Sequence, residues 1–93
     1  MIVERHVKIR VKGRVQGVFF RATTKDVADA MGLKGFVRNE RDGSVYIEAE
    51  GRSEIIEQFI AWCRQGPPRA VVENVDVNDD TVRGFPNFVV KRF

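Results

Sequence analysis

The chain has 93 residues, of which 43% are apolar and 31% are charged, and its mean hydropathy is -0.28. This length suits one domain with one core. The composition excludes a disordered chain, which would be poorer in apolar residues. No stretch approaches the roughly 20 consecutive apolar residues of a membrane-spanning helix. We therefore expect a single domain over residues 1–93, without a membrane partner.

The positive charge is concentrated in the first quarter of the chain. The formal net charge is +3 and the isoelectric point is near 9.4. Residues 1–25 hold seven Lys and Arg against one acid, a net +6, whereas the other 68 residues hold nine bases and twelve acids, a net −3. This distribution predicts that an anion binds near the first quarter.

One cysteine, Cys63, excludes an intrachain disulfide and a thiolate-cluster metal site. Residues 1–6 lack the apolar run of a signal peptide. We therefore expect a cytoplasmic address. Cys63 lies on the apolar face of a predicted helix, so we expect a buried structural thiol.

The first predicted elements are a strand, a loop and a helix. Apolar and basic residues alternate over residues 7–12, which predicts a half-buried strand with a basic outer face. Residues 13–17 form a loop that contains Gly13 and Gly17. From Phe20 the apolar spacing becomes helical, and Gly32 is typical of a helix end, which predicts a helix from about 20 to 32.

The rest of the chain predicts a hairpin, a second helix and two further strands. The strands 34–40 and 44–50 flank an Asp42–Gly43 turn. Ser53 is the expected N-cap of a helix that runs to about 65 and is stopped by Gly-Pro-Pro at 66–68. Residues 71–77 and 88–92 are predicted as strands.

The predicted order is β-α-β-β-α-β followed by a short extra C-terminal strand. Halves of this kind build an antiparallel sheet with both helices on one face, so we expect an α+β ferredoxin-like sandwich. This fold alone indicates no function.

The segment from Gly13 to Arg21 carries the strongest indication of chemistry. A glycine-containing loop that enters a helix can point several backbone N–H groups at one anion. The loop lacks the Gly-Lys-Ser/Thr of a nucleotide-binding P-loop. Arg21 falls in the first helical turn, where a cation opposes the helix dipole, which suggests that an anion binds there. The alternatives are that Arg21 pairs with an acid such as Asp29, or is solvated.

Two motifs resemble those of the acylphosphatases. Residues 13–21 match Gly-x-Val-x-Gly-Val-x-Phe-Arg at every fixed position. Residues 35–39 read Gly-Phe-Val-Arg-Asn, followed by Gly-Ser-Val at 43–45 and by Gly51. The length and the predicted element order agree with that family, and the resemblance covers essentially the whole chain. It implies metal-independent hydrolysis of the carboxyl-phosphate bond of small acyl phosphates, with no cofactor.

The resemblance also implies a set of site residues. Arg21 would clamp the substrate phosphate and Asn39 would orient the attacking water, as the two catalytic residues. Backbone amides would cradle the phosphate, from Val15, Gln16, Gly17, Val18, Phe19 and Phe20. The expected partners are a small acyl phosphate and inorganic phosphate, without nucleic acid, and the expected state is a monomer.

Two other functions are considered. Acylphosphatase-like domains occur inside larger proteins that handle carbamoyl phosphate, so a non-catalytic phosphate-binding module is one alternative. An RNA-binding sheet is the second, because basic domains of this topology often bind RNA. Residues 34–37 faintly resemble the start of an RNP1 box, but Arg38, Asn39 and Glu40 then occupy its aromatic positions.

The remaining residues receive structural interpretations. We expect His6 at the surface or at a sheet edge, and Glu40 paired with Arg38 or Arg41. The side chains of Val18, Phe19 and Phe20 are expected to be core anchors. A solvated acidic face is expected at Glu48, Glu50, Glu54 and Glu57.

Overall fold

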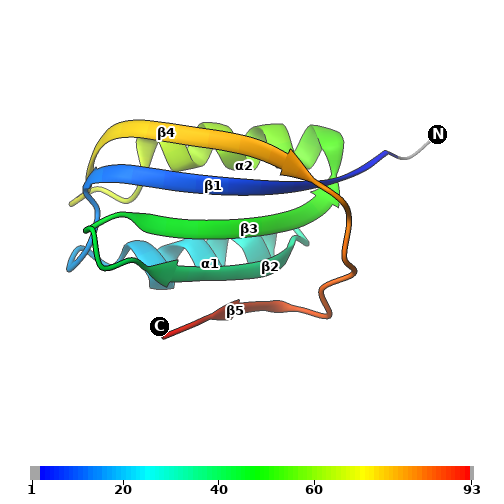
Figure 1. Cartoon of the computed structure of the whole chain (residues 1–93), viewed down its shortest axis with the longest axis horizontal. Coiled ribbons are helices and arrows are strands. Elements are labelled where there is room, and N and C mark those ends of the chain that lie inside the picture. The colour runs from blue at the N-terminus through cyan, green and yellow to red at the C-terminus, as the bar shows by residue number, and fades with distance from the viewer. Residues whose placement is uncertain (1–2, 93) are drawn as a thin grey trace.

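The computed structural model describes residues 3–92. Within them, five strands and two helices follow one another in the order that the sequence predicts (Figure 1). The elements are, in chain order, β1 (Glu4–Arg14), α1 (Phe20–Ala30), β2 (Lys34–Asn39), β3 (Val45–Arg52), α2 (Ser53–Gln65), β4 (Val71–Asp80) and β5 (Phe88–Val90).

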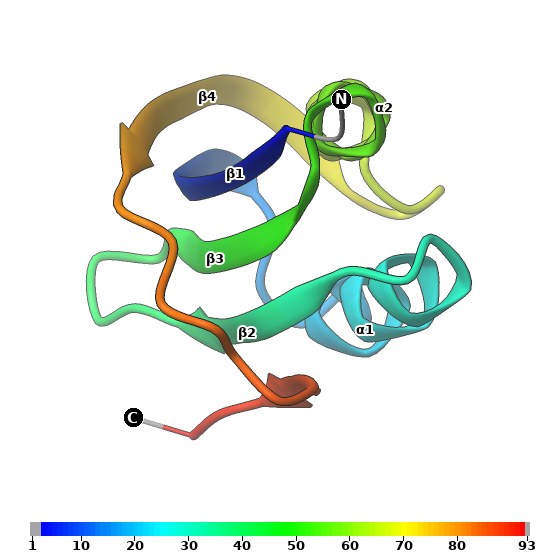
Figure 2. The same cartoon turned by 90° about the vertical axis from the view of Figure 1, so that its right-hand side faces the viewer.

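The five strands form one sheet in the order β4-β1-β3-β2-β5. Neighbouring strands are antiparallel except β5, which runs parallel to β2. Both helices cover the same face of the sheet, and Figure 2 shows them on one side with the segment 81–87 on the other. The fold is therefore the predicted ferredoxin-like α+β sandwich, and β5 makes its sheet mixed.

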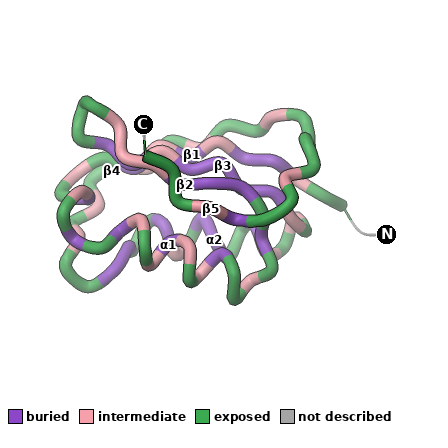
Figure 3. The backbone as a smooth tube through the Cα atoms, turned by 90° about the horizontal axis from the view of Figure 1, so that it is seen from below, coloured by how far each residue is buried: buried purple, intermediate pink, exposed green. Residues whose placement is uncertain are grey.

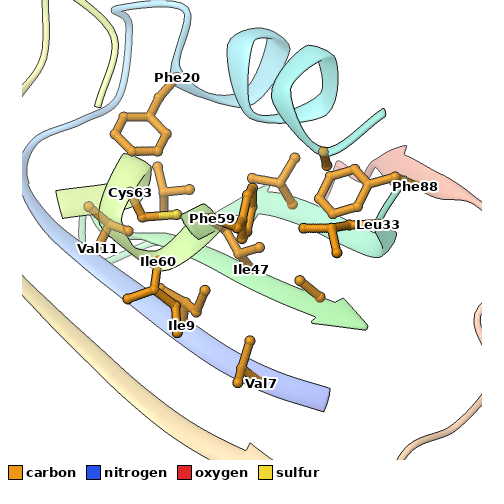
Figure 4. Close-up of a cluster of buried hydrophobic side chains, with 14 of the residues drawn as sticks. Val7, Ile9, Val11, Phe20, Leu33, Ile47, Phe59, Ile60, Cys63 and Phe88 are labelled. Atoms are coloured by element: carbon orange, nitrogen blue, oxygen red, sulfur yellow. The ribbon is translucent and has the colours of Figure 1, made fainter. Parts of the chain in front are cut away.

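The core lies between the sheet and the two helices. The alternation in β1 places Val7, Ile9 and Val11 toward the helices, and all three are fully buried. Side chains from both helices and from β5 close over them (Figure 4). In Figure 3 the buried stretches of β1, β2 and β3 run through the middle of the molecule. Cys63 is among the buried residues, as predicted, and burial raises the pKa of its thiol.

Several element boundaries differ from the predicted ones. Helix α1 ends at Ala30, and Gly32, at φ 71°, turns the chain toward β2. Ser53 is the first residue of α2 rather than its cap, because β3 continues through Arg52. The backbone N–H of Ser53 donates to the Val3 carbonyl at 2.8 Å. Strand β4 extends to Asp80, and β5 ends at Val90.

The sheet face away from the helices corrects three predictions. His6 is 1% exposed and belongs to β1, which lies inside the sheet, so it is neither at the surface nor at a sheet edge. Glu48 and Glu50 are 7% and 5% exposed, so they are buried rather than solvated. All three point away from the helices, as the alternation requires, but the segment 81–87 crosses above them. His6 Nε2 lies 2.7 Å from Glu48 Oε1, and Nδ1 lies 2.8 Å from the Thr81 carbonyl oxygen. Glu54 and Glu57 are exposed as expected.

No helix within residues 3–92 has the length and apolar character needed to cross a membrane.

Candidate active site

The loop between β1 and α1 is held in place by its buried side chains. Val15 and Val18 are 1% and 8% exposed, so they anchor the loop to the core. The Gln16 amide donates to the carbonyl oxygens of Glu40 and Ser44, at 2.7 and 2.9 Å. These two bonds tie the loop to the turn between β2 and β3.

The loop departs from ordinary backbone geometry just before α1. Gly17 has φ 74°, and Phe19, which precedes the helix, has φ 63°. Phe19 is the one non-glycine residue between 3 and 92 with positive φ, a strained conformation that is typical of functional sites. Its side chain is 69% exposed, so the expectation that Phe19 anchors the core is wrong, whereas Val18 and Phe20 are buried as predicted.

The loop, the start of α1, the end of β2 and residues 90–92 line an open cavity of about 360 Å³. The cavity is lined by Val15, Gly17, Phe19, Phe20, Arg21, Ala22, Asn39, Val90 and Arg92. It therefore brings together the two expected catalytic residues and four of the six expected loop residues. The side chains of the other two point elsewhere, since Val18 packs into the core and the Gln16 side chain reaches the β2–β3 turn. Their predicted contribution is through backbone amides, which stays a prediction.

Asn39 presents a buried oxygen without a partner. Among the described residues, its Oδ1 is the one buried side-chain nitrogen or oxygen that lacks a hydrogen bond. Leaving such an atom unsatisfied costs about 1–3 kcal/mol. Because Asn39 also lines the cavity, its unsatisfied amide is suited to hydrogen-bond a molecule bound there.

Arg21 lines the same cavity and makes no ion pair with any residue from 3 to 92. The acid that the sequence offered as a partner, Asp29, instead accepts a hydrogen bond from Lys25 at 2.6 Å. Pairing with Asp29 is therefore excluded. The guanidinium is half-buried and lies in the first turn of α1, so its charge is uncompensated where the helix dipole is also positive.

Most of the other cations in the first quarter are neutralised by acids from later in the chain. Arg5 pairs with Glu57 and Asp79, Lys8 with Asp80, Arg10 with Glu40 and Asp42, and Lys25 with Asp29. Glu40 also pairs with Arg38, at 3.3 Å, which is one of the two partners expected for it. Of the seven cations in residues 1–25, three therefore form no ion pair within residues 3–92, namely Lys12, Arg14 and Arg21.

Three residues of the cavity wall are not predicted by the sequence motifs, namely Ala22, Val90 and Arg92. Ala22 directly follows Arg21 in the chain, so the predicted role of Arg21 could have indicated that Ala22 also lies near the site. Val90 and Arg92 enter the wall because β5 pairs with β2 beside Asn39, and no local pattern in residues 88–92 indicates which strand they join.

Known proteins resemble this chain over nearly its whole length. The acylphosphatase family model matches residues 7–90. The acylphosphatase of Thermotoga petrophila is 47% identical over 87 residues, which covers 94% of this chain and 97% of that protein.

Solved structures agree with the sequence match. An acylphosphatase from Coxiella burnetii superposes with a TM-score of 0.91 at 35% identity, covering 95% of this chain and 93% of the other. The Bacillus subtilis acylphosphatase gives a TM-score of 0.91 at 34% identity, covering 94% and 98%. Sequence, fold and the two motifs that meet in one cavity all agree, and we conclude that this chain belongs to the acylphosphatase family, enzymes that hydrolyse acyl phosphates.

Proposed function

We propose that the cavity hydrolyses small acyl phosphates without a metal, and that Arg21, Asn39 and the loop amides perform the reaction. The observation that carries this proposal is that Asn39, whose Oδ1 is buried and unpartnered, lines the same cavity as the uncompensated Arg21. The amide oxygen of Asn39 can accept a hydrogen bond from a water molecule, and the guanidinium of Arg21 can bind a phosphate group.

The loop amides from Val15 to Phe20 and the guanidinium of Arg21 bind the phosphoryl oxygens. Amides at the N-terminus of a helix favour an anion, and the planar guanidinium offers two parallel N–H donors to two oxygens. Because the loop is anchored by Val15, Val18 and Gln16, these donors are in place before the substrate binds. Such preorganised donors stabilise the charge that develops in the transition state.

Asn39 orients the attacking water, whose O–H donates to Oδ1. The water oxygen forms a bond to phosphorus while the bond between phosphorus and the acyl oxygen breaks, and the bonding pair leaves with the carboxylate. The proton of the water passes to a phosphoryl oxygen. A carboxylate is a good leaving group, so the reaction needs no strong general acid. Phosphoryl transfer of this kind depends on positioning and on charge stabilisation.

We also propose that the enzyme acts as a cytoplasmic monomer and does not bind nucleic acid. The cavity has the size of a small-molecule site. Four of the seven cations in the first quarter are paired with acids of the same chain, which weakens any basic surface for a polyanion. The buried Cys63 suits a reducing compartment.

The test is release of phosphate from benzoyl phosphate in excess EDTA, by the natural sequence and by Asn39→Ala. We expect hydrolysis well above the buffer rate for the natural sequence. We expect Asn39→Ala to lower kcat while inorganic phosphate still inhibits with a similar Ki, because Arg21 and the loop remain.

Each alternative has its own outcome. Phosphate binding without hydrolysis would identify a non-catalytic phosphate-binding module. Activity that EDTA abolishes would contradict the metal-independent mechanism. Loss of phosphate inhibition in Asn39→Ala would assign Asn39 to phosphate binding rather than to water orientation.

A further inference from the structure

Arg92, two residues beyond the end of β5, lines the same cavity as Arg21 and Asn39. We propose that Arg92 is a further substrate-binding residue, whose guanidinium contacts the phosphoryl group from the β5 side of the cavity. The proposal rests on the proposed function of that cavity.

The register of the sheet places Arg92 beside Asn39. In the parallel pairing of β5 with β2, Val90 lies opposite Val37. The pairing continues past the strand end, because the Lys91 N–H donates to the Val37 carbonyl at 2.8 Å. Two residues further along each chain are Asn39 and Arg92, so the two reach the same end of the sheet on adjacent segments.

The alternation of the chain directs Arg92 and Lys91 to opposite faces of the sheet. Phe88 is buried in the core under the helices, and Val90 lines the cavity, so Arg92 continues the series on the face covered by α1. Lys91 lies on the other face, where its Nζ is 4.1 Å from the centre of the Phe36 ring. Two neighbouring cations thus differ in whether they reach the cavity.

The charges of the cavity wall favour a contact with phosphate. Among residues 3–92, the wall contains two arginines and no acidic side chain. Arg92 is exposed and forms no ion pair with any residue from 3 to 92. A phosphate group carries about −1.5 to −2 at neutral pH, by analogy with phosphorylated side chains, so Arg21 alone neutralises only part of it. A second guanidinium supplies the remaining charge and further N–H donors.

The test compares Arg92→Gln with Lys91→Gln, since both remove one positive charge at adjacent positions. The readouts are the Ki of inorganic phosphate, the calorimetric affinity for phosphate, and the KM of acetyl phosphate and of benzoyl phosphate. We expect Arg92→Gln to weaken phosphate binding about tenfold and to raise both KM values by the same factor. Arg92→Lys should be intermediate, and Lys91→Gln should behave like the natural sequence.

Three results would overturn the proposal. In the first, Ki is unchanged in Arg92→Gln. In the second, Lys91→Gln raises Ki equally, which would indicate a general effect of charge. In the third, KM changes for only one of the two substrates, which would indicate a contact with the acyl group. Failure of the proposed function is distinct, because the natural sequence would then release no phosphate, whereas calorimetry would still report whether Arg92 binds phosphate.

Discussion

Arg21 lies at a position that favours function over stability. Its cation is in the first turn of α1, where the helix dipole repels positive charge, and no acid within residues 3–92 compensates it. Phe19, two residues earlier, adds a left-handed backbone conformation, which costs about 1–3 kcal/mol. An anion bound in the cavity would account for both features, because it would interact favourably with the guanidinium and with the amides of the strained loop.

Substitution of Arg21 should therefore separate activity from stability. We expect Arg21→Ala to lower kcat/KM by about 10³-fold or more, by analogy with arginines that stabilise phosphoryl transfer. Arg21→Lys should recover little activity, because a point charge replaces a planar pair of donors. The free energy of unfolding of Arg21→Ala should stay equal or rise by about 0.3–1 kcal/mol, because a repulsion with the helix dipole is removed.

Kinetics and urea denaturation of the two variants measure these quantities, and Arg64→Ala, at an exposed arginine in the last turn of α2, is the matched control. If Arg21→Lys retained nearly full activity, a simple positive charge would suffice and the paired-donor role would be wrong.

Single residues also show where sequence patterns stop being informative. The period of two in β1 correctly directs Val7, Ile9 and Val11 to the helices, and His6 to the other face. It does not indicate that residues 81–87 cover His6, because that contact spans 75 positions of the chain. The motif likewise indicates Phe19 as a site residue, but the exposure of its ring follows from the left-handed φ, which its residue type does not predict.

At the scale of elements, the end of β1 and the loop that follows it depend on two glycines for different reasons. At Gly13, with φ 129°, an added Cβ would lie 2.2 Å from the Val71 carbonyl oxygen in β4. This close approach occurs where the β1–β4 register shifts between Lys12 and Gly13. At Gly17, with φ 74°, an added Cβ would meet no atom within 4 Å. Gly13 is thus needed for space and backbone geometry, and Gly17 for backbone geometry alone.

We therefore expect Gly13→Ala to destabilise the protein by about 3 kcal/mol or more, because the strands must move apart and the backbone is strained. Gly17→Ala should cost only about 1–2 kcal/mol. Urea denaturation of both variants measures the difference, with the slope of the transition as a check on two-state unfolding. Equal losses in the two variants would contradict this assignment of their roles.

Elements differ in how well local sequence predicts them. Both helices, the hairpin and β1 follow from periodicity and turn residues, because these features depend on nearby positions. The strand predicted over 88–92 is confirmed over 88–90. Its parallel pairing with β2 could not be predicted, because the partner lies about 50 residues away. That pairing brings Val90 and Arg92 into the cavity wall, which explains why the motif predicted Arg21 and Asn39 while the β5 side of the site was missed.

At the scale of the whole molecule, Glu50 links three distant parts of the chain. It belongs to β3, one of its oxygens lies 3.3 Å from Nδ1 of His6 in β1, and its carboxylate accepts backbone N–H groups of Arg83, Gly84 and Phe85. Burial alone would raise the pKa of this carboxyl. The three N–H donors, together with His6, outweigh burial and hold the pKa below its ordinary value.

This lowered pKa makes global stability depend on pH. The unfolded chain binds a proton at Glu50 more readily than the folded protein does, so the carboxylate stabilises the fold at pH values above its unfolded pKa. That contribution is lost as the pH falls through the folded pKa. At about pH 7, we expect Glu50→Gln to lower the free energy of unfolding by about 1.5–3 kcal/mol. The substitution removes the charge, and the NH2 group that replaces one carboxylate oxygen cannot accept a backbone N–H. The deficit should shrink between about pH 5 and about pH 2, where the natural carboxylate is itself protonated.

Urea denaturation across this pH range measures the effect, and Glu73→Gln provides a matched control. Glu73 is an exposed acid on β4 that forms no ion pair with residues 3–92, so its removal changes the net charge by the same amount without touching the segment 81–87. A deficit in Glu50→Gln that stayed constant with pH would show that packing, rather than the charge of Glu50, holds this segment over the sheet. A deficit equal to that of Glu73→Gln at every pH would show that only the net charge matters.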